Sequence, residues 1–111
     1  LNEIEQAIEE SERCFSSNSD CVGQLMECDR LIHEIISTST GNKFFIDGVR
    51  WLYDLTARIW RLSPNPAAHA REINQHHRNL LQALRKRDPD LAEQAMKRHI
   101  MDFWSQMRAQ V

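Results

Sequence analysis

The sequence predicts an all-α protein, an antiparallel bundle of five helices joined by short connections. Glycine and proline are scarce, three of each in 111 residues, and β-branched runs are few, which favours helices over strands. Apolar residues recur at the i, i+3/i+4, i+7 spacing of a helix that buries one face. Small polar residues, glycine and proline separate these periodic segments. With 41% hydrophobic and 27% charged residues, we expect one globular domain over residues 1–111.

The first predicted helix covers residues 1–15 and ends at the cluster Ser16-Ser17-Asn18-Ser19, whose side chains compete for backbone hydrogen bonds. Ser19 or Asp20 is a candidate cap for a second helix that reaches residue 37. The inward stripe of this second helix contains Val22, Leu25, Asp29, Leu31, Ile32 and Ile36. An aspartate within such a stripe requires a partner, because an unpaired buried carboxylate is costly.

The remaining three helices are predicted over residues 43–62, 67–86 and 89–109. A loop rich in serine and threonine, residues 37–42, precedes the first of them, and Ser63-Pro64-Asn65-Pro66 ends it. Asp88 followed by Pro89 is typical of a helix start, with a capping aspartate and proline at the first helical position. The last two helices therefore form a hairpin about Asp88.

Charge and hydropathy exclude several classes of protein. The formal net charge is −2, so no general basic field indicates nucleic-acid binding by these helices. The apolar runs are too short for a membrane-spanning helix, and no secretory leader is recognisable. Because the chain begins with Leu1 inside a helical pattern, we expect a fragment of a longer cytoplasmic protein.

Three cysteines, Cys14, Cys21 and Cys28, give an odd number without a CxxC motif. Cys21 and Cys28 would lie about 10 Å apart along one helix, which is too far for a disulfide. We therefore expect reduced thiols, as in a cytoplasm.

Two histidines lie symmetrically about the turn at Asp88. His77 is eleven residues before it and His99 is eleven residues after it. In an antiparallel hairpin this places both at the same level, about 16 Å along each helix. Both also belong to apolar stripes, so both imidazoles are expected to face the core.

The inward polar groups Asp29, His33, His77 and His99 suggest a metal site. Asp29 and His33 are one helical turn apart and share a face. Three imidazole nitrogens and a carboxylate oxygen suit zinc or another divalent transition metal, which would also offset the cost of burying Asp29. A structural alternative is a set of hydrogen-bonded core histidines with a local Asp29–His33 ion pair.

Five short motifs occur in an order that resembles one known family. They are Cys28-Asp29-Arg30-Leu31-Ile32-His33, Ser39-Thr40-Gly41-Asn42, His77-Arg78-Asn79-Leu80-Leu81-Gln82-Ala83-Leu84, Asp88, and Ala95-Met96-Lys97-Arg98-His99. This pattern is similar to the FadR C-terminal (FCD) effector-binding domain of GntR-type transcriptional regulators. The resemblance covers essentially the whole chain.

The resemblance implies a function and a set of site residues. In metal-binding members, the matching positions, here Asp29, His33, His77 and His99, hold a divalent ion beneath an effector pocket. Zinc is expected, with nickel and manganese as alternatives. The effector is expected to be a small carboxylate, with Arg58 and Asn42 as candidate contacts. A homodimer is expected, with no membrane association and DNA bound only through a winged helix-turn-helix domain that this chain lacks.

The chain departs from the family pattern at three points. Ile32 replaces an aromatic residue, His76 stands where the family has glutamate, and the family's first domain helix is missing. Because residue 76 is rotated 100° off the apolar stripe, His77 is the predicted ligand, and His69 and His76 are predicted to face solvent.

The predicted function is metal-dependent sensing of an organic acid, not catalysis. One alternative is a zinc-dependent hydrolase, although Glu27, Glu34 and Glu72 lie near polar faces and no inward carboxylate is left as a general base. A second alternative is a metal-free helical interaction domain. A di-iron bundle requires Glu-x-x-His pairs, and the sequence contains none.

Overall fold

The computed structural model describes residues 1–16, 21–62 and 70–109. It contains five helices, and these ranges include no strand, which confirms the predicted all-α bundle. The helices are α1 (Asn2–Ser16), α2 (Val22–Thr38), α3 (Lys43–Arg61), α4 (Ala70–Arg85) and α5 (Pro89–Ala109). The predicted breaks at residues 17–19 and 63–66, the candidate caps Ser19 and Asp20, and the first three residues of the predicted fourth helix lie outside the described residues.

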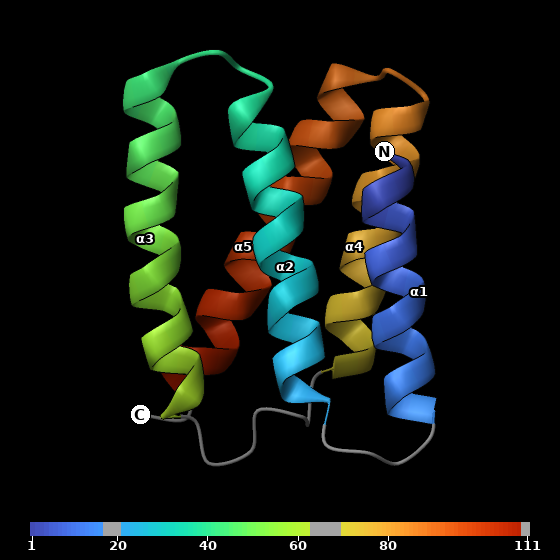
Figure 1. The fold of residues 1–111 in the computed structure, drawn as a ribbon, viewed down its shortest axis with the longest axis vertical. Helices are drawn as coiled ribbons and strands as arrows, with labels where there is room; N and C mark the ends of the chain where they lie inside the picture. The colour runs from blue at the N-terminus through green and yellow to red at the C-terminus, as the bar shows by residue number, and fades with distance from the viewer. Residues whose placement is uncertain (17–20, 63–69, 110–111) are drawn as a thin grey trace.

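The helices form two layers (Figure 1). The sequential pairs α1–α2, α2–α3 and α4–α5 pack against each other, and α4 also packs on α1 and α2. In Figure 1, α3 stands at one edge of the front layer, and α4 and α5 lie behind. No helix within the described ranges is both long and apolar enough to cross a membrane.

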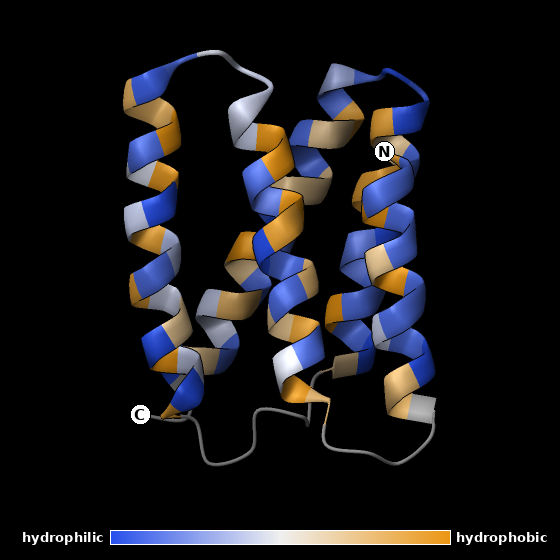
Figure 2. Cartoon of the chain, viewed as in Figure 1, coloured by the Kyte–Doolittle hydropathy of each residue, from blue (hydrophilic) through white to orange (hydrophobic). Residues whose placement is uncertain are grey.

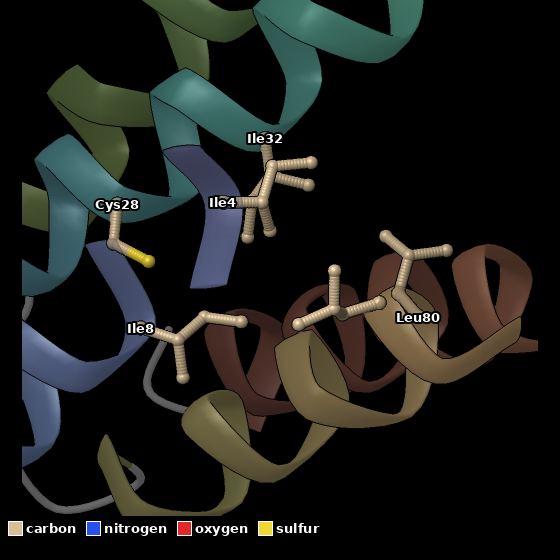
Figure 3. Packing of buried hydrophobic residues seen from close by; sticks show 6 residues of the cluster. Ile4, Ile8, Cys28, Ile32 and Leu80 are labelled. Carbon is tan, nitrogen blue, oxygen red and sulfur yellow. The ribbon is translucent and has the colours of Figure 1, made fainter. Parts of the chain in front are cut away.

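One apolar cluster joins α1, α2 and α4. Its buried members are Ile4, Ile8, Cys28, Ile32, Leu80 and Leu81. Figure 3 shows these side chains converging from the three helices. Each fully buried isoleucine or leucine contributes about 1.5–3 kcal/mol by leaving water, so this cluster fixes α2 against α4.

A second apolar cluster joins α2, α3, α4 and α5. Its buried members are Leu25, Trp60, Ala70, Ile73 and Met107. The Trp60 ring stacks on Phe103 of α5, with centroids 5.4 Å apart. Along α2, Asp29 lies between Leu25 and Ile32, and along α4, His77 lies between Ile73 and Leu80. The inward polar residues therefore occupy the gap between two apolar clusters.

Two helices have side-chain caps at their N-termini, and the sequence predicted one of them, Asp88. The Asp88 carboxylate accepts a hydrogen bond from the Leu91 amide at 3.1 Å, so Asp88 caps α5. Asn42 caps α3, because its side chain accepts from the Phe45 amide at 3.2 Å. Gly41, not Asn42, has the left-handed backbone, with φ of 67°, a conformation that glycine adopts without steric cost.

The prediction of three reduced cysteines is wrong. Cys14 near the end of α1 and Cys21, the N-cap of α2, form a disulfide with their Cα atoms 5.7 Å apart. The two α-carbons come this close because α1 ends at Ser16, so the seven-residue separation is not spanned by one continuous helix. Cys28 is a free, buried thiol. A closed loop of this length stabilises a fold by about 2–3 kcal/mol in the chain-entropy model.

Candidate metal centre and adjoining cavity

Asp29 and His33 come from one face of α2. Their one-turn spacing places His33 Nε2 3.4 Å from Asp29 Oδ1. Both side chains are about four-fifths buried, with exposed fractions of 20% and 18%. The predicted juxtaposition of these two residues is therefore present.

His77 of α4 and His99 of α5 approach the same carboxylate oxygen from the opposite layer. Their Nε2 atoms lie 2.9 Å and 2.8 Å from Asp29 Oδ1. The two rings meet edge to face with centroids 5.0 Å apart, as expected from their equal distance to the Asp88 turn. Both histidines are buried. The structure thus brings together all four residues selected from the sequence.

Three imidazole nitrogens crowd one oxygen atom, although a carboxylate oxygen offers only about two lone-pair sites. Two ligands bound at 2.0–2.1 Å to a common ion lie about 2.9 Å apart at a right angle and about 3.3 Å apart at the tetrahedral angle. The three Asp29–histidine distances, 2.8 to 3.4 Å, match that spacing. The ligand atoms of Asp29, His33 and His99 also all lie within 4.8 Å of one another, and His77 is not part of this group. These three donors fit a divalent transition metal, and His77 contacts the same Asp29 oxygen beside them.

The electrostatics of the cluster centre on Asp29. Burial raises the pKa of this carboxyl, but hydrogen bonds from His33, His77 and His99 outweigh it and hold the pKa well below its usual range. Burial also lowers the pKa of His33, yet the hydrogen bond to Asp29 and its charge reverse the net shift, so the pKa is raised. For the fully buried His77, burial dominates and the pKa is lowered. Asp29 therefore stays ionised at neutral pH.

The Nδ1 atoms of His77 and His99, which point away from Asp29, have different surroundings. His77 Nδ1 lies 3.7 Å from the thiol of Cys28, and burial raises the pKa of that thiol to about 12, so it stays neutral. His99 Nδ1 is buried and has no hydrogen-bond partner among the described residues. The Cys28 contact orients His77 so that its Nε2 faces Asp29.

His76 does not face solvent as predicted. Its side chain is 14% exposed, and its Nε2 lies 3.1 Å from Asp102 Oδ2. Its ring lies at a tilt to that of His99, with centroids 5.9 Å apart. Although His76 lies off the inward stripe of α4, the neighbouring helix α5 buries most of its side chain through Asp102 and His99. His69 lies outside the described residues.

A cavity of about 330 Å³ adjoins the cluster and is lined by residues of α2, α3, α4 and α5. Asp29, His33 and His99 form part of its wall. Tyr53 of α3 also lines it, donates a hydrogen bond to the Met26 carbonyl at 2.7 Å and places its ring 5.8 Å from that of His33. Tyr53 was not selected from the sequence, because a tyrosine on an amphipathic helix gives no signal of its direction.

The two candidate effector contacts do not line this cavity. Arg58 is not among the described residues around it. Asn42 is exposed and caps α3, and it is also absent from the described wall. The face of α3 that lines the cavity contains Val49, Tyr53 and Thr56. Arg58 lies on another face of the helix, together with Trp51 and Leu55.

The fold and this arrangement define a helical ligand-binding bundle with a histidine and carboxylate cluster at its cavity wall. A family model described as the FCD domain matches residues 1–102, and the chain belongs to the FCD family. FCD domains are the effector-binding domains of GntR-type transcription regulators. Comparisons with curated proteins and with solved structures gave no match.

Replacing Asp29 by asparagine should lower the pKa of His33 in metal-free protein. The new amide keeps an oxygen acceptor but removes the charge that outweighs burial. The pKa of His33 is higher in the folded protein than in the unfolded chain. Protonated His33 therefore stabilises the fold at a pH below the ordinary histidine pKa, and this stabilisation is lost as the pH rises through the raised pKa. NMR titration of the histidine rings in the presence of chelator measures the pKa of His33 in the unmodified protein and in Asp29→Asn. Asp102→Asn, which faces His76, is the control. If Asp29→Asn left the pKa of His33 unchanged, Asp29 would not be the group that raises it.

Proposed function

We propose that this FCD domain senses an organic acid through a divalent metal bound by Asp29, His33, His77 and His99. Zinc is the first choice, because three imidazoles and one carboxylate are a common zinc donor set, and nickel and manganese are the alternatives. The observation that carries the proposal is the convergence of three Nε2 atoms on Asp29 Oδ1 beside the cavity.

The chain's own residues would perform three tasks. Asp29 supplies a negative charge that its depressed pKa keeps available at neutral pH. Cys28 orients His77, and the two apolar clusters hold α2 against α4 so that the ligands are already close together. A bound metal would supply a positive charge and open coordination positions for an effector oxygen.

Regulation would follow from coupling between the cavity and the rest of a longer protein. The cavity is lined by α2, α3, α4 and α5, so a ligand that contacts all four favours one arrangement of these helices over others. Such a difference in affinity is what shifts an equilibrium between two states. DNA would be bound by a winged helix-turn-helix domain, in keeping with the net charge of −2 here.

The same proposal places the protein in the cytoplasm, where transcription is regulated. The Cys14–Cys21 disulfide weighs against this location, because disulfides are uncommon in that compartment.

A zinc hydrolase is the weaker candidate. Water activated by a metal is most effective with a separate general base. Asp29 is the one carboxylate among the described cavity-lining residues, and it is already committed to the three histidines.

A homodimer is also proposed, with the outer face of α3 as its interface. Phe44, Trp51, Leu55 and Leu62 recur at helical spacing and are 89%, 67%, 45% and 84% exposed. Figure 2 shows hydrophobic residues along α3 at the edge of the bundle. An apolar stripe of this length on a surface marks an association site.

His77→Ala and His99→Ala should each weaken zinc binding more than about tenfold, since each removes a ligand and loss of even an outer-shell partner costs 10–100-fold. Helical content should be kept. Competition titration with a chromophoric chelator gives the affinity, and elemental analysis gives the stoichiometry. His76→Ala is the matched control and should retain zinc. Full zinc content in His77→Ala, or its loss in His76→Ala, would show that the ligand was wrongly assigned.

Trp51→Glu should convert the dimer into a monomer, because it places a charge in the middle of the apolar face of α3. Sedimentation velocity over a range of concentrations measures the change. Leu91→Glu is the control, since Leu91 is an exposed leucine at the start of α5, 38% exposed. A monomeric unmodified chain at all concentrations would rule out this interface.

A further inference from the structure

The cavity has two chemically different parts. Its polar part contains Asp29, His33 and His99, with Tyr53 and Thr56 from α3. The rest of the described wall is apolar and consists of Leu25, Met26, Val49, Leu52, Ala57, Trp60, Ile73, Ile100 and Phe103. A molecule that fills this space therefore meets polar atoms at one end and hydrocarbon along most of its length.

Lysine and arginine are absent from the described wall. Two arginines of the helices around the cavity pair with glutamates outside it, Arg30 with Glu27 and Arg50 with Glu34. A second carboxylate on the effector would have no cation to meet. Hydroxyl groups of a sugar acid would face leucine, isoleucine and aromatic rings, and burying polar groups without partners is unfavourable.

The apolar part of the cavity is large enough to hold a hydrocarbon tail. Trp60 and Phe103, which both line the cavity, stack almost in parallel, with an angle of 7° between their rings. At about 30 Å³ for each water-sized atom, the volume of about 330 Å³ accepts roughly eleven non-hydrogen atoms. The lining residues Leu52 and Ile100 are 56% and 50% exposed, so the cavity opens to solvent beside them.

We propose that the effector is a monocarboxylic acid with one unbranched apolar tail, of about eight carbons in all. This inference rests on the proposed metal site, because the carboxylate end lies beside Asp29, His33 and His99. The tail lies along Trp60, Phe103 and the aliphatic residues of α2 and α3. Hydrophilic acids such as malate and gluconate are poor ligands by the same reasoning.

Isothermal titration of zinc-loaded protein with butanoate, hexanoate and octanoate tests this class. Each buried methylene tightens binding about fourfold, so octanoate should bind more than about a hundredfold tighter than butanoate, and the gain should stop once the tail exceeds the cavity. Malate and gluconate should bind more weakly than octanoate, and so should octanol, which lacks the carboxylate. Tighter binding of malate or gluconate, or equal binding of butanoate and octanoate, would overturn the inference.

A variant that fills the apolar part of the cavity tests the binding of the hydrocarbon tail separately from the binding of the carboxylate. Ala57→Phe adds a ring to the cavity wall and should weaken octanoate binding at least about tenfold while leaving butanoate and zinc binding unchanged. Leu91→Phe adds a ring at an exposed position of α5 that is not part of the described cavity wall and is the control. If both variants bind octanoate equally well, the tail lies elsewhere. Should Ala57→Phe fail to fold by circular dichroism, the chain-length series in the unmodified protein still decides the matter.

The zinc content of the same samples shows whether a negative result contradicts the proposed metal-dependent sensing or only the proposed class of effector. Protein that holds no zinc and binds no acid contradicts the proposed metal-dependent sensing itself. Protein that holds one zinc and binds malate or gluconate but no octanoate leaves the metal site standing and overturns the choice of effector. One zinc with no binding of any tested acid also overturns it.

Discussion

A single carboxylate oxygen, Asp29 Oδ1, connects three of the five helices. It lies within 3.4 Å of an Nε2 atom from α2, α4 and α5. A charged group buried to this degree destabilises a fold unless its partners are in place. The hydrogen bonds that hold its pKa low are therefore also what fixes the relative positions of α2 and the α4–α5 hairpin at this level. A metal ion among the same atoms would hold the three imidazoles together and carry the charge of Asp29.

The apolar clusters on either side stabilise this arrangement. Leu25 and Ile73 belong to one cluster, and Ile32 and Leu80 to the other. They bury the hydrocarbon of α2 and α4 above and below the polar residues, so the polar layer does not have to hold the helices together alone. The α3 helix packs mainly on α2 and leaves space for the cavity on its inner side and an apolar stripe on its outer side. One helix thus supplies both a cavity wall and a proposed dimer surface.

The helices and the four central residues were predictable because both depend on local periodicity. The turn at Asp88 sets His77 and His99 at one level, and the one-turn spacing sets Asp29 beside His33. Features that depend on the path between helices were not predictable. The Cys14–Cys21 disulfide requires knowing where α1 ends, and the coverage of His76 requires knowing how closely α5 approaches α4. The cavity wall combines residues from four helices, so neither the presence of Tyr53 in it nor the absence of Arg58 and Asn42 follows from the periodicity of α3 alone.

The most direct measurement is the zinc K-edge X-ray absorption spectrum of protein loaded with one equivalent of zinc. Coordination by Asp29, His33, His77 and His99 predicts a shell of nitrogen and oxygen atoms at about 2.0–2.1 Å, with the outer-shell scattering of three imidazole rings. A sulfur scatterer at about 2.3 Å would place Cys28 on the metal instead. A spectrum with one imidazole or none would contradict the convergence of the three histidines on a metal.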